Sequence, residues 1–187
     1  MKYELNFIVG ILGRVERCYV ADLRLQQIRG AFMANGMPID KRFTVNKLGW
    51  IYSMEFFSNL SELFRFFRND ADLNSRLKTT NDERMQLRKK VRDIANKSFD
   101  YNEQKTEMTP YITSLAVRGI NWHSEYLIVL EYVKEIMTAN AEKAGPFFFY
   151  QSLRGLQAFV MANPPNFNYP MPDLKKDLLP NDQPTTP

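Results

Sequence analysis

The residue types most often used in catalysis are scarce in this chain of 187 residues, which has one histidine, His123, and one cysteine, Cys18. A cysteine and a histidine form a nucleophile pair when the fold brings them together and a third group orients the histidine. These two residues are far apart in the sequence, and no third group can be named for them. Because His123 follows Trp122 in an apolar segment, we interpret it as a residue of the core or of an interface.

Other kinds of chemical site lack the residues that they need. One cysteine and one histidine do not supply the ligands of a zinc site. The run Gly10-Ile11-Leu12-Gly13 has neither the lysine nor the preceding strand of a phosphate-binding loop. We therefore expect no catalytic residue, no metal, no cofactor, no small-molecule substrate and no enzymatic activity. An enzyme of unfamiliar type with a deep pocket stays open as an alternative.

The basic residues of the chain suggest nucleic acid as a second class of partner. The net charge is +4 and the isoelectric point is about 9.1. Of the 40 residues from 68 to 107, 18 are charged, and the densest basic run is Arg88, Lys89, Lys90 and Arg92. Such a run usually forms a solvated helix face, but it could also bind phosphate. A helical nucleic-acid-binding protein, such as a viral nucleoprotein or a phage factor, is therefore the alternative function.

The elements that carry these residues are predicted to be helices. Apolar residues recur at helical spacing in residues 2–35, 43–67, 111–137 and 147–161. The first of these helices could be broken near Gly10 or Asp22. With 44% apolar residues and only 8 glycines, the composition favours long helices over many short strands. No apolar run is long enough to span a membrane. We expect an all-α domain over residues 1–174.

Two of the predicted helices are apolar over more than half of their circumference, which requires that they are covered on two sides. They lie in residues 40–75 and 108–142, on either side of the charged segment 68–107, which we interpret as an exposed helical projection. We expect them to form a long antiparallel hairpin that dimerises into a four-helix bundle. The predicted dimer interface consists of Trp50, Met54, Phe57, Leu60, Phe64, Trp122, Tyr126, Leu130 and Val133.

The last predicted helix is followed by NPPNFNYPMPDL, residues 163–174, which contains four prolines and two aromatic residues. Proline has no N–H and a fixed φ, so this stretch is neither a helix nor an inner strand. An extended, stiff arm that carries Phe167 and Tyr169 loses little entropy when it docks. The polar residues 175–187 are interpreted as a flexible linker or tail.

The order of these elements resembles the assembly domain of the hepadnavirus core (capsid) protein and, more loosely, that of the non-enveloped nackednaviruses. The residues that carry the resemblance are FVMANPPNFNYP, 159–170. Weaker similarities lie in residues 43–69, with Trp50, and at Trp122 and His123. In that family the fifth helix leads into a proline-rich arm, which inserts into a hydrophobic pocket of the neighbouring dimer.

The resemblance implies a capsid protein that dimerises and then assembles into an icosahedral shell around the viral genome. Residues 68–107 would then be an enlarged tip of the spike. The implied inter-dimer contacts are Phe159, Pro164, Pro165, Phe167, Tyr169 and Pro170, with Phe167 where the family has tyrosine. The family's spike cysteine has no counterpart here. The family's arginine-rich tail has none either, and the resemblance therefore implies that a basic tail of a full-length form would bind the nucleic acid. The implied location is the virion and the host cytoplasm, with the nucleus as an open alternative.

Overall fold

The computed structural model describes residues 5–33, 39–96, 108, 116–140 and 145–166, and within them all regular structure is helical. This confirms the predicted all-α class. The helices, given in chain order, are α1 (Leu5–Met33), α2 (Ile39–Phe66), α3 (Ala71–Arg76), α4 (Asn81–Asn96), α6 (Trp122–Asn140) and α7 (Gly145–Ala162).

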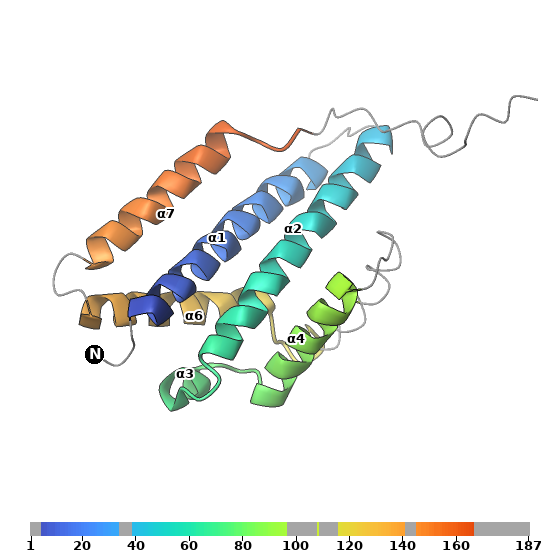
Figure 1. The fold of residues 1–187 in the computed structure, drawn as a ribbon. Coiled ribbons are helices and arrows are strands. Elements are labelled where there is room, and N and C mark those ends of the chain that lie inside the picture. The colour runs from blue at the N-terminus through green and yellow to red at the C-terminus, as the bar shows by residue number, and fades with distance from the viewer. Residues whose placement is uncertain (1–4, 34–38, 97–107, 109–115, 141–144, 167–187) are drawn as a thin grey trace, which may run out of the picture.

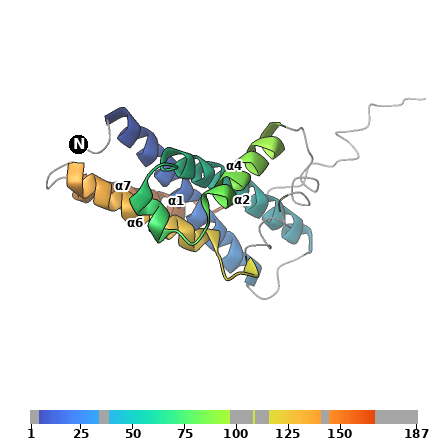
Figure 2. The ribbon, with the colours of Figure 1, turned by 90° about the horizontal axis from the view of Figure 1, so that it is seen from below.

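Four of the helices lie side by side in the order α7, α1, α2, α4, and α6 crosses this layer (Figure 1). The helices α1 and α2 run antiparallel and share the largest contact of the fold. When the molecule is turned by 90° from the view of Figure 1, α4 lies on the opposite side from α6 and α7 (Figure 2). The layer leaves α1 and α2 in the middle, where they are covered on both sides.

The helix α1 is continuous from Leu5 to Met33, without the predicted break near Gly10 or Asp22. Its buried residues recur every three or four positions and face α2, so one apolar stripe runs along the whole helix. Glycine costs a helix about 1 kcal/mol relative to alanine. The long contact with α2 compensates for that cost at Gly10, where the Phe66 ring lies 3.5 Å from the position that a Cβ would take.

The prediction that residues 40–75 pair with residues 108–142 in a long antiparallel hairpin is wrong. The helix that packs antiparallel along α2 is α1. The helix α6 meets α2 only where it crosses, through ring contacts of Phe56 with Tyr126 at 5.5 Å and of Phe64 with Trp122 at 6.0 Å. The second cover that the broad apolar face of α2 requires is therefore supplied within the chain, by α1, α4 and α6.

Residues 71–96 are not an exposed projection, since α4 lies along α2 and buries Leu87, Val91 and Ile94. Thr80 precedes α4 and forms a capping box with Glu83. The Glu83 carboxylate accepts a 2.7 Å hydrogen bond from the Thr80 N–H, and the Glu83 N–H donates to the Thr80 hydroxyl at 3.3 Å. The charged residues of this segment mark the outer face of a packed helix. Residues 97–107 lie outside the described residues.

The helix α6 begins at Trp122, later than the predicted start at residue 111. Gly119 has a φ of 67°, in the left-handed region that glycine adopts without strain, and it stands in the turn before the helix. The side chain of Asn121 then accepts a hydrogen bond from the His123 N–H at 2.8 Å and caps the first turn. Residues 109–115 lie outside the described residues.

A single apolar core joins α1, α2, α4, α6 and α7. Its fully buried members include Ile11 and Val15 of α1, Leu60 and Leu63 of α2, and Val129 of α6. Within the described ranges, no helix is long and apolar enough to cross a membrane.

Candidate functional site

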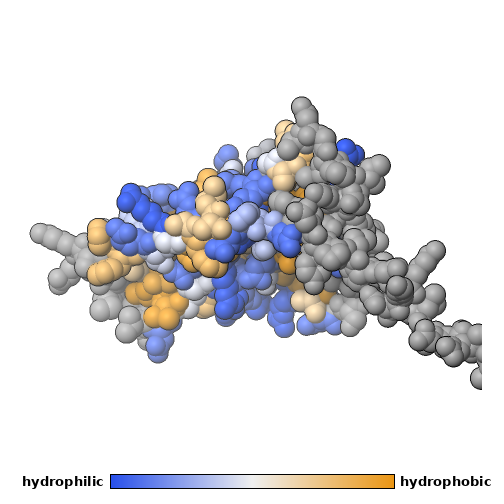
Figure 3. Space-filling model, turned by 90° about the horizontal axis from the view of Figure 1, so that it is seen from above, coloured by the Kyte–Doolittle hydropathy of each residue, from blue (hydrophilic) through white to orange (hydrophobic). Residues whose placement is uncertain are grey.

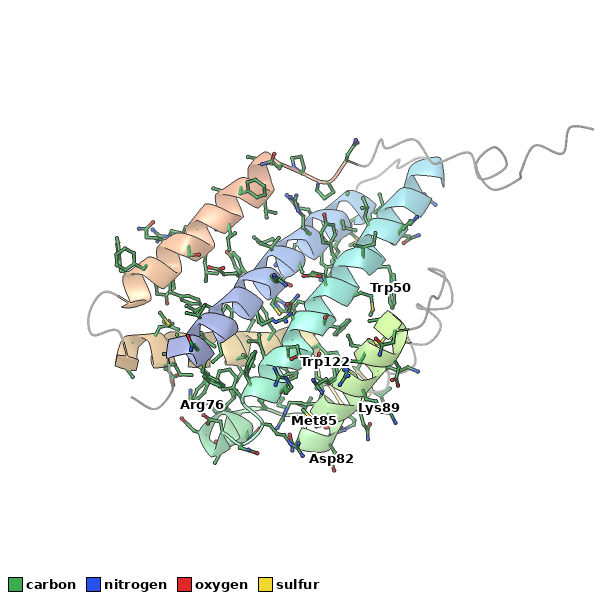
Figure 4. All side chains as sticks on the ribbon, viewed as in Figure 1. Trp50, Arg76, Asp82, Met85, Lys89 and Trp122 are labelled. Atoms are coloured by element: carbon green, nitrogen blue, oxygen red, sulfur yellow. The ribbon has the colours of Figure 1, made fainter. Side chains whose placement is uncertain are left out.

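The nine residues predicted for a dimer interface lie in or against this core. Trp50, Phe57, Leu60, Phe64, Trp122, Tyr126 and Val133 are buried by the chain itself, and Met54 and Leu130 are partly buried against them. Figure 4 shows Trp50 on α2 and Trp122 at the start of α6, and both side chains are buried. A contact between two chains through the buried members of this set would require the core of each chain to open first.

The exposed apolar surface is instead concentrated on α7. This helix docks on α1 and α6 through Phe149, Leu153 and Val160, which are buried. On its outward side Phe147, Phe148, Phe159 and Met161 are each between 60% and 67% exposed. Phe148 and Phe159 are eleven residues apart, which is three helical turns or about 16 Å along one side of α7. We call these four residues the α7 outer face.

Apolar side chains are visible on the molecule in separate patches among hydrophilic ones (Figure 3). Elsewhere the exposed large apolar side chains are distributed over several elements: Val9 and the adjacent pair Phe32 and Met33 on α1, Ile51 on α2, Val117 before α6 and Leu127 on α6. Isolated apolar residues of this kind are normal on protein surfaces, whereas several on the outward side of one helix favour an interaction surface.

A buried arginine holds the C-terminal end of α7. Arg24 is only 9% exposed, and its guanidinium donates to the carbonyl oxygens of Val160, at 3.2 Å, and of Asn163. Gln27 of α1 also donates to the Val160 carbonyl at 3.2 Å. A cation at a helix C-terminus satisfies carbonyls that have no partner in the helix and is favoured by the helix dipole. These contacts fix the point at which the proline-rich segment leaves α7.

The predicted inter-dimer residues divide between the described and the undescribed parts of the chain. Phe159 is 61% exposed on the α7 outer face, Pro164 is exposed and Pro165 is half-buried. Phe167, Tyr169 and Pro170 lie outside the described residues, as do the rest of the predicted arm and the tail 175–187.

The basic run on α4 does not form a uniform positive patch. Arg88 donates to a Glu62 carboxylate oxygen at 3.0 Å and so joins α4 to α2. Lys89 and Arg92 are exposed, but exposed Asp82 and Asp93 lie on the same outward side of α4. Figure 4 shows Asp82 and Lys89 on the side of α4 that points away from α2. The phosphate-binding role predicted for this run stays a prediction.

A groove of about 970 Å³ lies where α1, α2 and the start of α6 meet. It contains His123 in a geometry that the sequence did not reveal. The Nδ1 atom of His123 lies 3.0 Å from the Oδ1 oxygen of Asp22 on α1, and Gln26 donates to the other Asp22 oxygen at 2.8 Å. The side chains of His123 and Asp22 are 42% and 15% exposed. His123 therefore lies at the wall of the groove, where solvent reaches it.

The two weak nucleophiles near this histidine are held in their neutral forms. Burial raises the pKa of the Cys18 thiol, and the nearby Glu55 carboxylate raises it further. The thiol donates a 3.6 Å hydrogen bond to the Phe56 carbonyl and is fully buried. Burial likewise raises the pKa of the Tyr126 hydroxyl. A Cys18–His123 nucleophile pair is not formed, since His123 pairs with Asp22. Within the described residues, no cluster of three or more metal-ligating side chains occurs.

A second polar site is buried between α6 and the connection from α3 to α4. Glu125 is 0% exposed and its carboxylate accepts hydrogen bonds from the N–H groups of Lys78 and Thr79, at 3.0 and 3.1 Å. Arg84, 3% exposed, donates to the carbonyl of Thr79 and to the side chain of Asn74. Every contact in this network joins parts of the chain, and we assign it a structural role.

Comparison of the chain with protein-family models, with curated proteins and with solved structures found no match.

Proposed function

We propose that the protein is a self-associating subunit of the capsid type, and that the α7 outer face and the proline-rich segment after it form the contacts between copies. The observation that carries the proposal is that four large apolar side chains, each at least 60% exposed, share the outward side of α7, with one pair near its start and one pair near the fixed exit of Pro164 and Pro165. Burial of these apolar side chains against a second protein surface removes them from water and is favourable.

The energetics favour a weak contact that is repeated many times. Burial of one large apolar side chain contributes roughly 1.5–3 kcal/mol, so the four residues supply at most about 6–12 kcal/mol. Association costs on the order of 4–15 kcal/mol in lost freedom of motion. A single contact is therefore near balance, whereas a closed shell links many contacts and stabilises each one.

In this proposal the dimer contact differs from the one first expected. Two copies meet through α7. The nine residues predicted for the interface of a four-helix spike pack in or against the core of each copy. The alternative of a nucleic-acid-binding protein gains no support from α4, because its outward side carries charges of both signs.

The test is the assembly state of wild-type protein and of a Phe148→Ser, Phe159→Ser double variant. Both side chains are exposed, so the variant should keep its fold and its thermal stability. Wild-type protein should form large particles in sedimentation velocity and in negative-stain micrographs, and the variant should not. The matched control is Ile51→Ser, which removes a half-exposed apolar side chain from α2 and should leave assembly unchanged. A wild-type protein that remains at 22.0 kDa at high concentration and high salt would overturn the proposal.

A further inference from the structure

We propose that the groove between α1, α2 and the start of α6 binds single-stranded RNA, and that His123, positioned by Asp22, cleaves it. This inference goes beyond self-association and does not depend on it. It starts from the pairing of the histidine with an aspartate 101 residues earlier in the chain, at the wall of a groove large enough for a nucleotide.

The imidazole of His123 is oriented by a carboxylate, as the imidazole of a histidine general base is. Nδ1 faces the Asp22 carboxylate at 3.0 Å, and the backbone N–H of His123 is bound by the Asn121 side chain at 2.8 Å. A carboxylate on Nδ1 fixes the tautomer that carries its proton there, which leaves the lone pair on Nε2. No described residue bonds Nε2. The Gln26 amide holds the second oxygen of Asp22, so the carboxylate is fixed as well.

Among the residues that the structure describes, none at this site is an activated nucleophile. Cys18 and Tyr126 are buried, and the pKa of each is raised by that burial. The hydroxyl of Ser53, which lines the groove, donates to the Gly49 carbonyl at 2.7 Å. A base without a protein nucleophile suits a substrate that brings its own. RNA does so, because a ribose 2′-hydroxyl adjoins every phosphodiester bond.

The walls of the groove carry groups that fit such a substrate. Arg29 lies seven residues after Asp22, on the same side of α1 and about 10 Å further along it. No described acidic residue pairs with its guanidinium, which is thus available to a phosphate neighbouring the one that is cleaved. Phe32 is 45% exposed and offers a ring on which a base can stack. Asn46 offers an amide for the edge of a base.

The reaction is an internal transesterification. Nε2 of His123 takes the proton of the 2′-hydroxyl, and the 2′-oxygen attacks the adjacent phosphorus. The bond from phosphorus to the 5′-oxygen breaks, and that oxygen takes a proton from the imidazolium or from water. The products are a 2′,3′-cyclic phosphate and a 5′-hydroxyl end, so no water molecule is consumed and no oxidant or reductant is needed.

The test uses a labelled single-stranded oligoribonucleotide, the same sequence with 2′-O-methyl groups, and the corresponding DNA. Wild-type protein should cut only the unmodified RNA and leave a cyclic phosphate that mass spectrometry detects. His123→Ala should lower kcat at least 100-fold, in the range expected for loss of a general base. Asp22→Asn should lower kcat with KM unchanged, while Arg29→Met should raise KM with kcat unchanged.

Arg17→Met is the control for Arg29→Met, because Arg17 is an exposed arginine of the same helix away from the groove. It should cut RNA as the wild type does. Equal cleavage of DNA, or cleavage that survives His123→Ala, would overturn the proposal. Failure of wild-type protein to bind or cut any of the three strands would overturn it as well, and this result would leave the assembly test unaffected.

Discussion

The hydroxyl of Thr79 donates a 2.6 Å hydrogen bond to Oε2 of Glu125, a carboxylate that no solvent reaches. Together with two backbone N–H donors, this bond joins the start of α6 to the connection between α3 and α4. Buried charges are costly unless they are fully hydrogen-bonded. The contact therefore makes the position of α6 depend on a segment that lies some 46 residues away in the sequence.

Glu125→Ala should destabilise the fold by roughly 3–5 kcal/mol, because it leaves the N–H groups of Lys78 and Thr79 and the Thr79 hydroxyl without their acceptor and removes the negative charge near the buried Arg84. Thr79→Val keeps the shape of the side chain and should cost about 1–3 kcal/mol. Chemical denaturation measures both changes. The control is Glu135→Ala on the same helix, whose exposed ion pair with Arg76 is screened by water and should contribute little to stability. Equal effects at positions 125 and 135 would contradict the structural role of the network.

Replacement of Arg24 by methionine should loosen the C-terminal end of α7 while most of the fold persists. The variant retains apolar bulk but loses the donors that hold the carbonyls of Val160 and Asn163. Hydrogen exchange of the amides near residue 163 should become faster, with a loss of about 1–3 kcal/mol in local stability. Arg17→Met, an exposed change on the same helix, should leave that exchange as it is. Unchanged exchange in the Arg24 variant would show that the guanidinium does not hold the end of α7.

The helices themselves could be predicted from sequence because helical periodicity is a local property. Ile11, Val15 and Cys18 follow one another at spacings of three or four residues, and the stripe that they form needs no knowledge of its partner. The pairing of helices is different. Since α2 is apolar on most of its circumference, its hydrophobic pattern fits both α1 and α6 and does not distinguish between them.

The groove could not be predicted because its two central residues lie on helices that are distant in sequence. Before the fold is known, nothing around Asp22 distinguishes it from Glu16, the other acid of α1. Glu125 did carry a signal that was missed. It falls three residues after Trp122 and four before Val129, within the apolar stripe of α6, and an acid in a buried stripe indicates a buried polar network.

Leu60→Ala should test whether the residues first predicted for a dimer interface belong to the core of one chain. Leu60 is 0% exposed, so its truncation should cost roughly 2–5 kcal/mol. If the loss arises within the chain, the fall in unfolding temperature should be the same at low and high protein concentration. A fall that varies with concentration would instead place Leu60 between subunits. Ile51→Ala, a half-exposed position of the same helix, is the control and should have little effect.

The ion-pair network of Glu62 should make stability depend on pH in the acid range. Partial burial opposes ionisation of this carboxyl, but the hydrogen bonds from Arg65 at 2.7 Å and Arg88 at 3.0 Å outweigh it, and the pKa of Glu62 is lowered. The unfolded chain, with a glutamate pKa of about 4.3, then binds a proton before the folded chain does. The stabilisation is thus complete above that pH and is lost as the pH falls through the lower folded pKa.

Glu62→Gln removes this titration, so the variant should be less stable than the wild type at pH 7 and should approach it in stability as the pH falls towards 3. Denaturant unfolding at a series of pH values measures the difference. Glu131→Gln, which removes a carboxylate 63% exposed beside Lys134, should differ little from the wild type at any pH, because water screens that pair. A constant difference between wild type and Glu62→Gln from pH 7 to pH 3 would mean that the contacts of Glu62 act through packing of α4 on α2 rather than through its charge.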